Sequence, residues 1–328
     1  MKIGAVFPTT EIGSDVALIR DYVQAAEGLG FSHLLMLDHV LGIDPGGGKL
    51  VGPYTYKHPF HEPMTFMAWA AAITSLIEFI TGILILPQRQ TALVAKQAAE
   101  VDLLSGGRLR LGVAVGWNKP EYDALGEDFG VRGRKLDAQI TVMRELWAND
   151  LVNVSDRWHT IDGAGINPRP EHPIPIWLGG MSEAAMRRAA RRGDGWLPYF
   201  LPDEATGELR TALRSGSASA EDREGKRPVI GAIAYEGGEL ASDVIDRMRS
   251  YLDEEGRGDV PFMLHGGMAI GKRTAEDTAA WTERWAAAGF DYIAVDTMNA
   301  GLRPDQHIDM LRRYREVLPA PLSGGAKT

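Results

Sequence analysis

Short apolar runs alternate with longer segments of helical periodicity along this chain, and this alternation limits the possible fold more than any other feature. Residues 3–7 form the first apolar run. Apolar residues then recur at helical spacing from Val16 to Leu29, between Ser14, which can cap a helix, and Gly30, which can end one. A strand followed by a helix is the unit from which parallel sheets are built.

The same unit repeats to the end of the chain. The predicted strands are residues 3–7, 33–37, 79–86, 109–115, 174–178, 196–199, 229–235 and 292–295. Helices are predicted near residues 63–76, 93–104, 136–147, 182–192, 204–213, 241–253, 274–288 and 306–317, and a hairpin within residues 151–170. Eight strands with mostly parallel connections favour a (β/α)8 TIM barrel with insertions.

The barrel is predicted as one domain over residues 1–318, with a disordered tail at residues 319–328. An open, doubly wound sheet is the structural alternative. No Gly-x-Gly-x-x-Gly pattern follows the first strand, which argues against a dinucleotide-binding version of that alternative.

Charge and composition exclude several classes of function. The chain has 35 Lys and Arg against 44 Asp and Glu, a net charge of −9, so its overall field repels nucleic acid. It has no cysteine for a disulfide, a thiolate nucleophile or a thiolate metal site. No apolar stretch reaches the ~18 residues that span a bilayer, and the first apolar run is too short for a signal segment. We expect a cytoplasmic protein without a nucleic-acid or membrane partner.

In a parallel α/β barrel the chemistry lies at the C-terminal ends of the strands, so we looked for functional side chains directly after each apolar run. Asp38 and His39 follow the second run. His39 is the best candidate for proton transfer, because histidine titrates near neutral pH and a neighbouring carboxylate can orient its ring. A histidine that only packs or caps an element is the alternative.

Two further strand ends carry candidate ligand-binding residues. Gly179, Gly180, Met181 and Ser182 join a strand to a helix start, where free amides favour a phosphate; a tight turn capped by the serine is the alternative. Trp117 follows Gly116 and can stack on a planar ring or wall a substrate pocket, unless it only fills the core. The strand ends at residues 87–89 and 296–299 were also selected.

The segment of residues 41–61 is long for a connection in a compact fold and is predicted to be a lid, with Tyr54, Tyr56 and Phe60 available to cover a ring. His58 and His61 lack the His-Glu-x-x-His spacing, so no metal site is predicted. No Gly-x-Ser-x-Gly motif is present to supply a hydrolase nucleophile.

Several of these motifs together resemble the luciferase-like family of flavin and F420 enzymes, over residues 3 to about 318. The resemblance rests on Gly-Leu-Gly-Phe at 28–31 running into Asp38-His39, on the run at 81–89, on Leu-Leu-Ser-Gly-Gly-Arg-Leu at 103–109, on Gly116-Trp117 followed by Glu121, and on Ile-Pro-Ile-Trp-Leu-Gly-Gly at 174–180. Each motif alone has little specificity; their combination is specific.

The resemblance implies where the cofactor lies. Its ring would lie across the C-terminal strand ends beside Gly116, with a non-proline cis peptide in a bulge of the third strand behind it, by position Leu84-Ile85. Gly179, Gly180 and Met181 would hold the cofactor phosphate. Asp38 and His39 would lie near the reactive carbon.

The resemblance also implies the chemistry. An Asp-His pair after the second strand looks like the F420-using branch, in which hydride passes to or from the deazaflavin C5 and the histidine exchanges a proton. Trp117 stands where sugar-phosphate dehydrogenases of that branch place a catalytic glutamate, which argues against that substrate. We therefore predict an F420-dependent oxidoreductase, of class EC 1, in which Asp38, His39 and Trp117 act on an unidentified small organic molecule.

Two alternatives stay open. One is an FMN-dependent two-component monooxygenase that draws reduced flavin from a partner reductase. The other is a protein that binds flavin or F420 without turnover. The resemblance also implies an F420- or flavin-reducing partner enzyme and a homodimer.

Overall fold

The first strand and helix show how local sequence sets the elements of this computed structural model, which describes residues 1–44, 54–198, 241–269 and 275–318. β1 (Lys2–Val6) leads into α1 (Val16–Gly28). The N-cap of α1 is Asp15 and not the predicted Ser14, because the Asp15 carboxylate accepts hydrogen bonds from the amides of Ala17 (2.9 Å) and Leu18 (3.4 Å).

The chain then alternates strands and helices, with insertions, to its C-terminal helix. The remaining strands are β2 (His33–Met36), β3 (Glu78–Thr81), β4 (Leu84–Ile85), β5 (Leu109–Ala114), β6 (Val152–Ser155), β7 (Thr160–Ala164), β8 (Ile176–Gly179), β9 (Gly195–Leu197), β10 (Met263–Ala269) and β11 (Tyr292–Asp296). The remaining helices are α2 (Pro63–Ala72), α3 (Thr91–Ser105), α4 (Lys119–Ala124), α5 (Arg132–Ala148), α6 (Glu183–Arg192), α9 (Ala241–Glu254), α10 (Ala275–Ala287) and α11 (Gln306–Val317), with short 3-10 turns at Leu86–Gln88 and Phe129–Val131.

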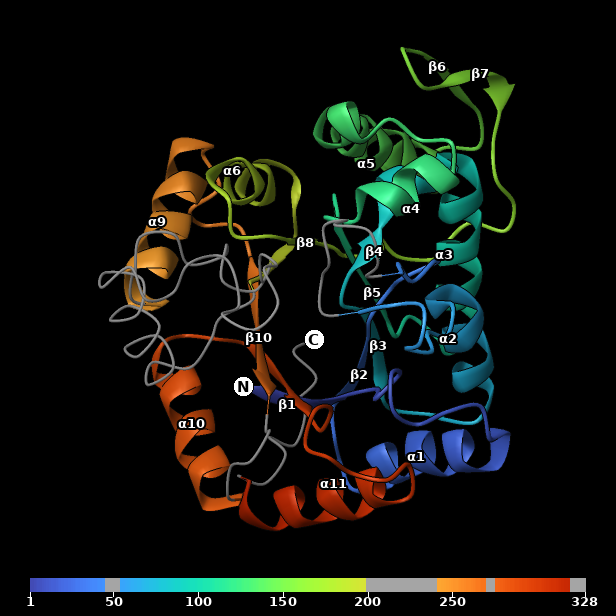
Figure 1. The fold of residues 1–328 in the computed structure, drawn as a ribbon. Helices are drawn as coiled ribbons and strands as arrows, with labels where there is room; N and C mark the ends of the chain where they lie inside the picture. The colour runs from blue at the N-terminus through green and yellow to red at the C-terminus, as the bar shows by residue number, and fades with distance from the viewer. Residues whose placement is uncertain (45–53, 199–240, 270–274, 319–328) are drawn as a thin grey trace.

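The strands form a closed parallel barrel, as the sequence predicted. Around the barrel the order is β1, β2, β3, β5, β8, β9, β10 and β11, and β11 pairs again with β1. The helices surround this ring on the outside, and the antiparallel hairpin β6–β7 projects away from it (Figure 1). The predicted hairpin within residues 151–170 is thereby confirmed.

The seventh strand of the barrel was assigned to the wrong segment. β10 takes that place, between β9 and β11, whereas the predicted strand at residues 229–235 lies outside the described residues. The sequence of β10, Met-Leu-His-Gly-Gly-Met-Ala, contains a histidine and two glycines, so it does not read as an apolar run. The absence of a side chain at Gly266 leaves room for the ring of Phe290, which would lie 3.3 Å from an added Cβ.

The third strand is interrupted, but not where the resemblance placed the cis bond. The structure has a non-proline cis peptide at Gly82-Ile83, not at Leu84-Ile85. It falls between β3, which ends at Thr81, and β4, which begins at Leu84. The bulge therefore begins directly where the β3 ladder stops, and Leu84 and Ile85 are already back in parallel pairing with β5.

Some predictions fall on parts of the chain that the structure does not describe. These are the helix at residues 204–213, the tail at 319–328 and the middle of the predicted lid, residues 45–53. Within the described ranges, no helix is both long and apolar enough to cross a membrane.

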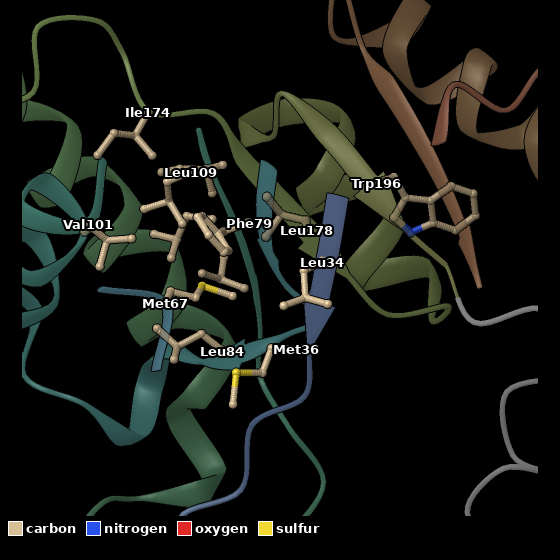
Figure 2. Close-up of a cluster of buried hydrophobic side chains, with 14 of the residues drawn as sticks. Leu34, Met36, Met67, Phe79, Leu84, Val101, Leu109, Ile174, Leu178 and Trp196 are labelled. Carbon is tan, nitrogen blue, oxygen red and sulfur yellow. The ribbon is translucent and has the colours of Figure 1, made fainter. Parts of the chain in front are cut away.

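Two apolar clusters result from the alternation of side chains along each strand. The larger one lies between the strands and the surrounding helices; Figure 2 shows Leu34, Phe79 and Leu109 from strands together with Met67 from α2 and Val101 from α3. The smaller cluster fills the inside of the barrel. Its members are Val6, Leu35, Ile80, Trp177, Leu197, Tyr292, Ala294 and Met298, and Leu37 and Ile83 pack against them.

A histidine pair closes the N-terminal end of the barrel interior. Nε2 of His33 lies 3.0 Å from Nε2 of His265, so one ring donates a hydrogen bond to the other, and Nδ1 of His33 contacts the Ser32 hydroxyl at 2.9 Å. The rings of Trp177 and Tyr292 pack against them. Burial lowers the pKa of His265 to about 3 and lowers that of His33 well below its usual value.

These pKa shifts predict acid instability. Both rings stay neutral in the folded protein, whereas histidines of the unfolded chain take up protons near pH 6.5. The free energy of unfolding should therefore fall as the pH drops from 6.5 toward 3, by about 1.4 kcal/mol per unit for each such histidine. Thermal unfolding across this range measures the effect. His265→Gln, which can still donate to His33, should flatten the dependence.

The exposed His172 provides the control, because His172→Gln should leave the pH dependence of the unfolding temperature unchanged. Equal pH profiles for wild type and His265→Gln would contradict the assignment.

Candidate active site at the C-terminal ends of the strands

His39 stands at the mouth of the barrel, just beyond the end of β2, inside a group of aromatic rings. Its ring meets those of Phe60, Tyr54 and Trp117 edge-on, with centroid distances of 4.9, 5.5 and 5.6 Å. Its side chain is only 8% exposed. Tyr54 and Phe60 come from the described end of the predicted lid, whereas Tyr56 is 60% exposed and turned away. His39 is thus in contact with three of the other predicted residues, Trp117 and the lid aromatics Tyr54 and Phe60.

A buried carboxylate that the sequence analysis gave no function, Glu121 of α4, holds His39 and the start of the lid together. Its Oε1 accepts hydrogen bonds from the amides of Val40 (2.5 Å) and Leu41 (2.9 Å). Its Oε2 accepts one from Gln88 (3.1 Å) and lies 3.4 Å from Nδ1 of His39. With Nδ1 turned toward a carboxylate, the other ring nitrogen of His39 is left for a ligand.

The charge state of Glu121 follows from these contacts. Burial raises the pKa of the carboxyl, but the contact with His39 and the hydrogen bonds from Leu41 and Gln88 outweigh it, so the pKa is lower than usual. Glu121 is therefore an anion at neutral pH. The available signal in the sequence was an acidic residue in the first turn of a short helix, seven residues after a strand end, which is too common to single out.

Asp38 is joined to protein groups on both of its carboxylate oxygens. Oδ2 accepts a hydrogen bond from the amide of Ile85 (2.9 Å), and Oδ1 accepts one from Arg89 (2.8 Å), which also pairs with Glu62 (2.9 Å). Burial raises the pKa of Asp38 by more than the positive charge of Arg89 lowers it, so the pKa of Asp38 is above its usual value. The structure thus connects two predicted site residues, Asp38 and Ile85, and ties the end of β2 to the bulge.

Glycines allow the side chains of the bulge to lie against neighbouring strand ends. An added Cβ at Gly116, where φ is +65°, would lie 2.8 Å from Cγ2 of Ile85. An added Cβ at Gly179 would lie 2.8 Å from Cγ2 of Ile83 and 3.2 Å from Cβ of Ala114. Side chains at these positions would displace the bulge, so Gly116 and Gly179 together keep one side of the mouth low and apolar.

The serine cap predicted at the turn from β8 into α6 is present. The Ser182 hydroxyl caps the helix by accepting from the amide of Ala185 (3.3 Å). Gly180 has φ +113°, and its carbonyl accepts a hydrogen bond from Trp196 (2.8 Å). Among the described residues, the amides from Met181 to Ala184 have no acceptor, so this helix start can still bind an anion.

Across the described part of the chain, no group of three or more His, Asp or Glu side chains is arranged to hold a metal ion.

Removing the Glu121 carboxylate should destabilise the protein. Glu121→Ala leaves the amides of Val40 and Leu41 without an acceptor in a buried place, so we expect a loss of about 3–5 kcal/mol in the free energy of unfolding. Asp123→Ala is the matched control, because Asp123 lies on the same helix with its side chain 58% exposed; its effect should stay within about 0.5 kcal/mol. Denaturant unfolding measures both, and similar losses would contradict the role of Glu121.

Gly179→Ala should lower stability by about 1–3 kcal/mol, since its methyl group would overlap Ile83. In the double variant with Ile83→Ala, the added methyl group has a smaller side chain beside it. The loss of stability should therefore be smaller than the sum of the losses of the two single variants. Gly28→Ala, at the end of α1 with nothing within 4 Å of the added Cβ, should cause no loss and a gain of at most about 1 kcal/mol, because alanine is the better helix former. Thermal unfolding of the four variants decides; strict additivity would rule out the contact.

Comparison with known proteins agrees with this fold. A family model described as luciferase-like monooxygenase matches residues 1–320. The uncharacterized protein Rv0940c of Mycobacterium tuberculosis is 33% identical over 199 residues, which are 58% of this chain and 68% of that protein. Pyrimidine monooxygenase RutA of Stutzerimonas stutzeri is 32% identical over 194 residues; the match spans 57% of this chain but only 49% of RutA.

Solved structures show the same fold. An F420-dependent secondary alcohol dehydrogenase, in complex with an F420–acetone adduct, superposes with a TM-score of 0.71 at 15% identity, covering 97% of this chain and 98% of that chain. EDTA monooxygenase from Chelativorans sp. BNC1 superposes with a TM-score of 0.64 at 16% identity, covering 99% and 96%. Since the family model covers nearly all of the barrel, the chain belongs to the luciferase-like monooxygenase family.

Proposed function

We propose that this protein is an F420-dependent oxidoreductase that exchanges a hydride between the deazaflavin C5 and a small organic substrate. The observation that carries the proposal is the placement of His39: a histidine at the barrel mouth, ringed by aromatic side chains and held by the buried carboxylate of Glu121. Hydride exchange with a carbonyl or alcohol requires a proton to move at the neighbouring oxygen, and a histidine with one free nitrogen can supply or accept it.

The residues of the mouth fit a flat cofactor with a phosphate. The low apolar side formed around Gly116 and Gly179 offers a surface for a ring, with Ile83 and Ile85 packed against these glycines. The amides that follow Gly180, beginning with Met181, have no acceptor among the described residues and offer hydrogen-bond donors for a phosphate. Bound there, the cofactor would supply the hydride. Both F420 and FMN carry a flat ring system and a phosphate, so these features support either cofactor.

Each side chain has a role in this proposal. His39 holds or releases the proton, and Glu121 orients it. Asp38 keeps the bulge in place through the Ile85 amide. Trp117 and the lid aromatics limit the space around the reacting atoms and keep water out.

A second candidate is an FMN-dependent two-component monooxygenase. It is favoured by the likeness to RutA proteins, which are 31–32% identical over more than half of this chain. Such an enzyme would take reduced FMN from a partner reductase and would consume oxygen, whereas an F420-dependent enzyme would need an F420-reducing partner and no oxygen.

Titration of the purified protein with F420 and, separately, with FMN decides between them. Fluorescence quenching should show binding of F420 and none of comparable affinity for FMN. Binding of FMN alone would overturn the proposal in favour of the monooxygenase.

His39→Ala tests for turnover. It should lower F420-linked oxidation of a panel of secondary alcohols by a factor of about 10²–10⁴ while F420 affinity changes little, because the histidine moves a proton and does not hold the cofactor. His172→Ala, at an exposed position, is the control. A variant altered only in ligand affinity would instead point to a binding protein without turnover.

A further inference from the structure

Asp296 is the last inward-facing residue of β11. Along this strand, Tyr292 and Ala294 belong to the cluster inside the barrel, whereas Ile293 and Val295 belong to the layer under the helices. Because successive side chains of a strand point to opposite faces, Asp296 continues the inward series. Its carboxyl therefore lies at the C-terminal end of the barrel interior.

The height of Asp296 within the barrel can be fixed against β2. Ala5 of β1 pairs with Leu34 of β2 on one side and with Val295 of β11 on the other, so Leu35 and Asp296, the next residues along, flank Val6. His39 lies four residues beyond Leu35, past the end of β2, and β1 separates β2 from β11 in the barrel. Asp296 thus belongs to the floor of the mouth and His39 to its wall.

The position of Asp296 around the barrel is also informative. Counting the closed ring in either direction, β11 and β5 are four strands apart, so they stand opposite each other. The C-terminal end of β5 leads to Gly116, on the low apolar side that accommodates the cofactor ring in the proposed function. A substrate lying on the exposed face of that ring would therefore have Asp296 on its other side.

The Asp296 carboxyl keeps free hydrogen-bonding capacity. Oδ1 accepts from the amide of Met298 (2.8 Å), and no other hydrogen bond of this side chain is found in the described residues. Two titratable groups face it: Glu11, from the segment after β1, and Tyr22 of α1. Glu11 in turn lies 3.4 Å from Nε2 of His307. Burial and the nearby charge of Glu11 raise the pKa of Asp296, whereas the hydrogen bond from the Met298 amide lowers it. The resulting pKa is about 7.

We propose that the Asp296 carboxyl faces the bound substrate and donates a hydrogen bond to an oxygen on its reacting carbon. This inference rests on the proposed function, because it takes the mouth to be the site of hydride exchange. A carboxylic acid that keeps its proton up to about pH 7 can stabilise the negative charge that develops on such an oxygen. The substrate class is then small alcohols or carbonyl compounds, with His39 moving the proton and Asp296 holding the oxygen.

The test uses 2,4-dinitrophenolate, a flat oxyanion that stays ionised across the neutral pH range and whose visible absorbance reports binding, with protein saturated with F420. Wild type should bind the probe, and Asp296→Leu should bind it roughly 10-fold or more weakly, since a hydrogen bond to a charged group is lost. Wild-type affinity should fall as the pH rises through about 7, because the ionised carboxylate repels the probe. Asp296→Asn, of nearly the same shape, should keep part of the affinity and lose that pH dependence.

Asp309→Asn, on the outer surface of α11 with the side chain 64% exposed, is the matched control and should bind the probe as wild type does. Thermal unfolding confirms that the compared variants are folded. Equal affinity of wild type and Asp296→Leu, or no binding by either, would overturn the role of Asp296. If F420 itself does not bind, the same series with FMN-saturated protein still decides the role of Asp296, while the F420 proposal fails separately.

Discussion

Closure of the parallel sheet is the constraint on which the rest of this structure depends. β3 pairs with β5 through Phe79–Leu109 and Ile80–Arg110, and this pairing turns an open row of strands into a ring. A closed parallel ring has no free edge, and it brings all C-terminal strand ends to one rim. His39, Trp117, Gly179 and Asp296 are far apart in the chain, yet they share that rim because each one ends or follows a strand.

Buried carboxylates then fix the shape of the rim. Asp38 ties the end of β2 to the bulge through the Ile85 amide, and Glu121 ties the same segment to α4 through the Val40 and Leu41 amides. Each has a cation or a histidine beside it, Arg89 for Asp38 and His39 for Glu121. A buried charge is tolerated only when hydrogen bonds and a partner such as these replace the water it has lost. These contacts therefore make a single arrangement of the mouth much more favourable than others.

Histidine appears at both ends of the barrel interior under opposite conditions. At the N-terminal end, His33 and His265 hydrogen-bond each other among aromatic rings and stay neutral. At the mouth, His39 has a carboxylate on Nδ1, and its second nitrogen has no hydrogen-bond partner among the described residues. The same residue type therefore serves the packing of the barrel at one end and proton transfer, in our proposal, at the other; the difference comes from the partner that each ring meets.

The sequence by itself determined the barrel and most of its strands, because apolar runs and helical periodicity are local consequences of burial on one face. It also placed His39 and Trp117 at the strand ends, since a motif after an apolar run needs no tertiary information. The sequence did not identify β10, because the glycines and the histidine of this strand are explained only by their contacts with Phe290 and His33. Only the tertiary structure decided what surrounds the carboxyl groups of Glu121 and Asp296, because the donors and apolar side chains next to them come from distant parts of the chain that meet once the ring has closed.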